Sequence, residues 1–132
     1  MEKALRYELI NAVPELNNQV YPTNAPEGAT KPYLVYMRTG TDLIKTLQGY
    51  TGDEYLSFVF NVMAVKYSDM SRVRKEVTEI LMGFPTTVIG DGDKFYVEDI
   101  NINRIEEQFE HQLGVNRGIV DFTIYFKKDN EL

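Results

Sequence analysis

Few residues of this 132-residue chain are of types that could carry out chemistry. His111 is its single histidine, and the chain contains no cysteine. A cysteine nucleophile, a thiolate zinc site and a disulfide framework are therefore excluded. No nucleophile and base of a hydrolase can be recognised, and His111 is read as a solvated surface residue. We expect the protein not to be an enzyme and to need no cofactor.

The clearest metal-like spacing is the pair Asp91 and Asp93, which begins as a calcium-binding loop does. The pattern then fails, because Phe95 stands where a third oxygen ligand belongs and Tyr96 where the sharp turn needs glycine. Residues 90–93 have the dipeptide chemistry of a hairpin turn. We therefore expect a turn here and no metal site.

Acidic residues are concentrated in residues 91–110. This stretch has seven acidic side chains and two basic ones, a formal charge of −5 in a chain whose net charge is −6. Such a run is usually a solvated face, but it could also steer a basic partner or meet a basic surface on another copy. The acidic candidates for an interface are Asp91, Asp93, Glu106, Glu107 and Glu110. The acidic balance argues against a nucleic-acid-binding protein.

Hydrophobic periodicity predicts an α+β fold in which two helices pack on a mostly antiparallel sheet, with long mobile loops. Apolar residues on both faces of residues 56–66 predict a central strand covered on both sides. Ser68 or Asp69 is expected to cap the second helix. Residues 103–113 fit a helix or a strand, and we favour strand, with residues 115–118 as a hairpin connection. The expected helices are 3–12 and 69–83, and the expected strands are 19–21, 33–39, 56–66, 86–89, 94–102 and 119–128.

Two connections complete the expected organisation. Residues 22–32 hold three prolines and read as a loop. Residues 40–53 hold three glycines and also the large apolar side chains Ile44, Leu47 and Tyr50, so we expect a long functional loop. Exposing these three side chains to water is costly, so they either fold back on their own domain or bury against another chain.

The chain as a whole reads as one domain, residues 1–132, because its length is typical of a single domain. No stretch approaches the roughly 20 apolar residues that a membrane-spanning helix needs. The last four residues, 129–132, are expected to fray.

Three stretches resemble the tail-terminator or tail-completion proteins of long-tailed bacteriophages, including the tail-to-head joining members. The first runs from Leu5-Arg6-Tyr7 to the short strand before Pro22. The second joins Pro32-Tyr33-Leu34-Val35-Tyr36 to Thr46-Leu47-Gln48-Gly49. The third leads from the strand at residues 59–64 through Tyr67-Ser68-Asp69 into the helix that ends near Leu81. Beyond residue 84 only the pattern agrees, with long strands and an expected turn at Arg117-Gly118.

The resemblance implies a structural role in a virion. Members of the family form a hexameric ring at the head-proximal end of the tail tube, stop tube growth and dock to the head connector. The implied partners are other copies of the chain, the tail tube protein and the head completion or connector protein. The implied location is the virion, and the host cytoplasm during assembly. The free chain is then expected to be a monomer whose residues 40–53 become ordered on assembly.

A second class of function also fits the composition. An acidic cytosolic adaptor or regulatory module would bind a basic protein through residues 91–110.

Overall fold

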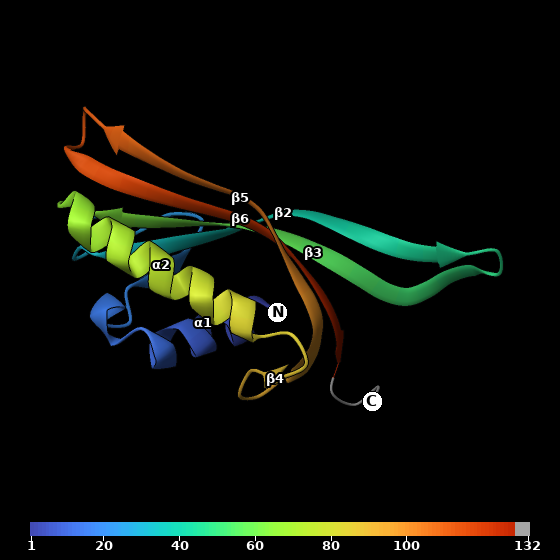
Figure 1. Cartoon of the computed structure of the whole chain (residues 1–132). Helices are drawn as coiled ribbons and strands as arrows, with labels where there is room; N and C mark the ends of the chain where they lie inside the picture. The colour runs from blue at the N-terminus through green and yellow to red at the C-terminus, as the bar shows by residue number, and fades with distance from the viewer. Residues whose placement is uncertain (129–132) are drawn as a thin grey trace.

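The computed structural model describes residues 1–128 and contains, within that range, one curled sheet with two α-helices on one of its faces (Figure 1). The sheet order is β1-β2-β3-β6-β5-β4, with β1 and β2 parallel and all other neighbours antiparallel. The helices are α1 (Glu2–Ala12), the 3-10 helix η1 (Pro14–Leu16) and α2 (Tyr67–Gly83). The strands are β1 (Val20–Pro22), β2 (Tyr33–Thr46), β3 (Gly49–Ala64), β4 (Val88–Ile89), β5 (Phe95–Glu110) and β6 (Val115–Lys128).

The predicted α+β fold and both predicted helices are confirmed. In α1, Leu5 and Leu9 are buried one helical turn apart, and the helix ends just before Pro14. In α2, the buried residues also follow helical spacing. The expected cap is wrong, because Lys66 occupies the N-cap position and no side chain caps the helix. The fraying expected for residues 129–132 lies outside the described residues.

The core lies between the helices and the two central strands, β3 and β6. Phe122 of β6 is fully buried, and its ring centroid lies 5.7 Å from that of Phe58 and 4.8 Å from that of Phe60. Alternate residues of both strands thus face the helices, as the burial of Phe58, Phe60 and Phe122 shows. β3 is central, as expected, but both helices lie on the same side of the sheet, so no helix of the described residues covers its other face (Figure 1).

Gly118 lets α2 approach β6 closely. A Cβ atom at this position would lie 2.7 Å from the Sδ atom of Met70, closer than non-bonded atoms can pack. Because Gly118 lies within β6 and pairs with Val62 of β3, the turn expected at Arg117-Gly118 is wrong. The turn instead covers residues 111–114, earlier than the expected connection at residues 115–118.

The strands are far longer than the helices that cover them. A 17-residue helix such as α2 spans about 26 Å, whereas a 16-residue strand such as β3 spans roughly 50 Å. Figure 1 shows the result: the ends of β2 and β3 extend beyond the helices as a two-stranded hairpin. We call residues 40–53 of this hairpin the arm.

The arm corrects the prediction of a long loop. Residues 40–46 and 49–53 belong to β2 and β3, and a two-residue turn, Leu47 and Gln48, connects the strands. Gly49, which follows this turn, has a φ of 110°. Glycine adopts this backbone conformation much more readily than other residues do, which explains why a glycine stands at this position of the arm. Residues 103–110 continue β5, so the preference for strand over helix in this segment is confirmed up to Glu110.

The buried aromatic cluster predicts a large difference between two Phe-to-Ala variants. Because Phe122 is fully buried, Phe122→Ala is expected to lower the free energy of unfolding by about 3–5 kcal/mol. The matched variant Phe109→Ala removes a half-exposed ring of β5 and is expected to cost less than about 1 kcal/mol. Urea unfolding followed by circular dichroism measures both, and equal losses would contradict the assignment of the core.

Candidate assembly interface

The apolar side chains of the arm point into solvent. Leu47 is fully exposed, at 107% of its reference area, and Tyr50 and Leu43 are exposed by 69% and 61%. Ile44 is half-buried. Of the two sequence alternatives for these side chains, folding back on the domain is therefore wrong for Leu47 and Tyr50. Exposed apolar area costs about 25 cal/mol per Å², so the arm would gain free energy from a partner surface.

The base of the arm is tied to the helical side of the molecule. The Arg38 guanidinium of β2 forms an ion pair and hydrogen bond with Glu2 of α1 and lies 5.8 Å from the ring centroid of Phe58. Burial raises the pKa of Glu2, but the hydrogen bond and charge of Arg38 outweigh it and leave this pKa below its usual value. Near the tip, the Lys45 ammonium lies 5.3 Å from the centroid of the Tyr50 ring.

The acidic interface candidates on β5, which are Glu106, Glu107 and Glu110, have basic partners from the same chain. Glu107 accepts a hydrogen bond of 3.0 Å from the Tyr67 hydroxyl and lies 3.6 Å from the Arg74 guanidinium of α2. Glu110 lies 3.4 Å from Arg117 of β6. Arg104 forms an ion pair with Glu106 on its own strand. Much of the negative charge expected to attract a basic partner is therefore balanced internally.

Asp91 and Asp93 lie in a different part of the molecule. They occupy the turn between β4 and β5, where they help line a groove beside α1. The backbone N–H of Gly90 donates a hydrogen bond of 3.1 Å to Glu8 of α1, which holds this turn in place. Within residues 1–128, no three His, Asp or Glu side chains gather where they could hold a metal ion.

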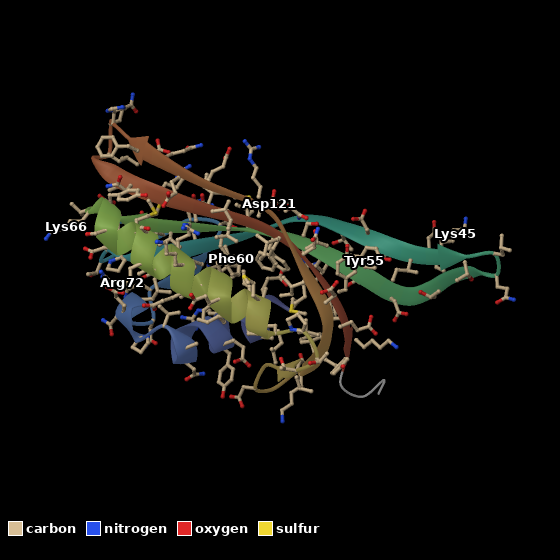
Figure 2. The ribbon with its side chains drawn as sticks, viewed as in Figure 1. Lys45, Tyr55, Phe60, Lys66, Arg72 and Asp121 are labelled. Atoms are coloured by element: carbon tan, nitrogen blue, oxygen red, sulfur yellow. The ribbon has the colours of Figure 1, made fainter. Side chains whose placement is uncertain are left out.

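The predicted interface residues therefore fall into separate regions. Figure 2 shows Lys45 near the arm tip and Lys66, at the start of α2, at the opposite end of the molecule. Glu107 belongs to the Lys66 end, because it contacts Tyr67 of α2. The structure thus separates the apolar candidates from the acidic candidates of β5, and Asp91 and Asp93 from both.

Sequence reasoning missed a second group of exposed apolar residues at the Lys66 end. Tyr67, which bonds to Glu107, and Val65, whose carbonyl accepts a 3.0 Å hydrogen bond from Asn116, lie beside the β5–β6 hairpin. The signal lies in the regular spacing of apolar residues along β5 and its turn, which places large side chains on a segment that also carries many charges. The exposed members are Val65, Tyr67, Ile105, Phe109 and Leu113.

Neither α-helix of the described chain has the length and apolar character needed to cross a membrane.

The exposure of the arm predicts that its tip contributes little to folding. Replacing Leu47 and Tyr50 together by serine is expected to change the free energy of unfolding by less than about 1 kcal/mol, because exposed side chains rarely contribute more. Thermal and urea unfolding of the double variant check this expectation. A loss of several kcal/mol would mean that the tip packs against its own domain.

Comparison with known proteins gives a likeness of fold. No protein-family model and no curated protein sequence matches the chain. Among solved structures, a chain from the "Virion of native gene transfer agent (GTA) particle" matches with a TM-score of 0.62 and 15% sequence identity. The match covers 93% of this chain and 94% of that one, so nearly the whole fold is shared. The architecture found here is thus also that of a chain in a virion particle.

Proposed function

We propose that this chain is a structural protein of a virion that caps the head-proximal end of a phage tail tube as a hexameric ring and mediates joining of tail to head. It acts without catalysis or a cofactor. Its partners are neighbouring copies, the tail tube protein and the head connector, and it works in the virion after assembly in the host cytoplasm.

The observation that carries this proposal is the nearly full-length likeness of fold to a chain of a virion particle. The sequence resemblance to tail-completion proteins points in the same direction and supplies the finer role at the tail end.

The geometry of the arm supports an assembly role over an adaptor role. Leu47 and Tyr50 are held away from the core on a paired hairpin, where a partner can bury them without any change in the domain. The adaptor alternative depends on the acidic stretch, and three of its seven carboxylates are paired with Arg74, Arg104 and Arg117. A role based on apolar contact therefore fits the surface better than one based on free negative charge.

Electron microscopy of head-free tails tests the proposal. Purified chain added to tails made without it is expected to appear as a cap of sixfold symmetry at one tip. Tails without the chain are expected to fail to join heads. The Leu47→Ser, Tyr50→Ser double variant is expected to reduce capping at least tenfold, because it removes the apolar area that the tube or a neighbouring copy would bury.

Met82→Ser is the matched control, since Met82 is an exposed apolar residue of α2 that lies away from the arm. This variant is expected to cap tails as the unaltered chain does. The proposed function would be refuted by a chain found along the whole tube or inside the capsid, or by tails that join heads normally without it.

A further inference from the structure

The pairing of β2 with β3 is interrupted where the arm begins. Arg38 pairs with Phe58, and the next paired residue of β2 is Gly40, which lies opposite Ser57. Thr39, between them, therefore has no partner on β3. This is a β-bulge, in which one extra residue bends its strand and increases the local twist. Because the arm begins at residue 40, a bend at this bulge sets the direction of the whole arm.

The arm is not held in this direction by packing of its large side chains. Leu43, Leu47 and Tyr50 are all exposed rather than buried in the core. The pairing of the strands is irregular again between Leu43 and Lys45, farther along the arm. A two-stranded hairpin on its own is only marginally stable. The direction of the arm therefore depends on contacts at its base.

One set of contacts joins this base to α1. The Arg38 guanidinium pairs with the carboxylate of Glu2, which also lies 3.8 Å from the amino group of Met1. Arg38 lies 5.8 Å from the ring centroid of Phe58, which is fully buried and so fixed in place. Glu2 is in the first turn of α1, where the helix dipole favours a carboxylate. The folded domain thus holds both members of the pair, directly before the bulge.

We propose that the arm turns about the bulge at Thr39 and that the Glu2–Arg38 pair is a latch that holds it in the direction seen here. The inference rests on the proposed function, because a docking arm that turns can adjust to the surface it meets. Both side chains of the pair are 38% exposed. A pair at the surface changes an equilibrium by up to about fivefold, so the latch biases the direction of the arm without fixing it.

Spin labels measure the direction of the arm in the free chain. The substitutions Gln48→Cys at the tip and Glu79→Cys on α2 provide two labelling sites in a chain that has no cysteine of its own. Pulsed electron spin resonance then gives the distribution of distances between the labels. One distance is expected to dominate when the latch is intact. Glu2→Gln removes the charge of the latch and is expected to raise the population of other distances two- to fivefold.

Glu15→Gln is the matched control. Glu15 belongs to another exposed ion pair, with Arg72 of α2, and Figure 2 shows Arg72 toward the opposite end of the molecule from Lys45. This variant is expected to leave the distribution of distances unchanged.

Two further variants separate the latch from the bulge. Glu2→Gln combined with Arg38→Gln is expected to broaden the distribution no more than Glu2→Gln alone, because both lack the same pair. Deletion of Thr39 from the Glu2→Gln chain lets the two strands pair without interruption and is expected to restore a narrow distribution. Unfolding temperatures within a few degrees of that of the unaltered chain show that the variants fold.

The contrary outcomes are distinct. An unchanged distribution in Glu2→Gln would refute the latch, and a broad distribution that persists after deletion of Thr39 would refute turning about the bulge. Both measurements use the free chain, so either result would leave the proposed function standing. Failure of the unaltered chain to cap tails would refute the proposed function and, with it, the use inferred for the latch.

Discussion

The rest of this structure depends on one constraint. Two helices cover one face of a sheet whose strands are much longer than the helices. α1 and α2 bury the inner side chains of β3 and β6, including Phe60 and Phe122, and this contact forms the core. The ends of the long strands lie beyond the reach of the helices, and the opposite face of the sheet has no helix on it (Figure 1). The arm and the apolar residues near the β5–β6 turn both follow from this mismatch in length.

This arrangement explains why the described part of the molecule, residues 1–128, is rich in surface that a partner could cover. Two groups of its exposed apolar residues lie far apart: Leu47 and Tyr50 at the tip of the arm, and Phe109 and Leu113 at the β5–β6 hairpin. Surfaces at opposite ends favour contacts that repeat from copy to copy rather than a closed symmetric pair. Internal ion pairs such as Glu107 with Arg74 keep the acidic stretch from acting as a simple docking patch.

The parts of the fold that could be predicted are those where burial imposes a period. The alternation of Phe58, Phe60 and Val62 and the helical spacing of Val73 and Val77 both arise because one face is in the core and the other is not. The arm has no buried face, so apolar and polar residues do not alternate regularly along it. Its three glycines are instead typical of a loop. Strand pairing there depends on backbone hydrogen bonds and a tight turn, which leave little trace in side-chain pattern.

The candidate site was predictable by residue type and not by place. The apolar character of residues 40–53 draws attention to side chains that the structure leaves exposed, whereas adjacency in sequence wrongly suggests that residues 91–110 form one acidic surface. An extended strand such as β5 carries its residues far apart, so Asp93 and Glu110 cannot share a patch.

Amide hydrogen exchange of residues 40–53 tests the central claim most directly, namely that this arm finds its partner only on assembly. Measured in the free chain and in assembled tails, the outward-facing amides of β2 and the tip at Leu47 and Gln48 are expected to exchange quickly in the free chain and at least tenfold more slowly in tails. Unchanged exchange across the arm would contradict the account.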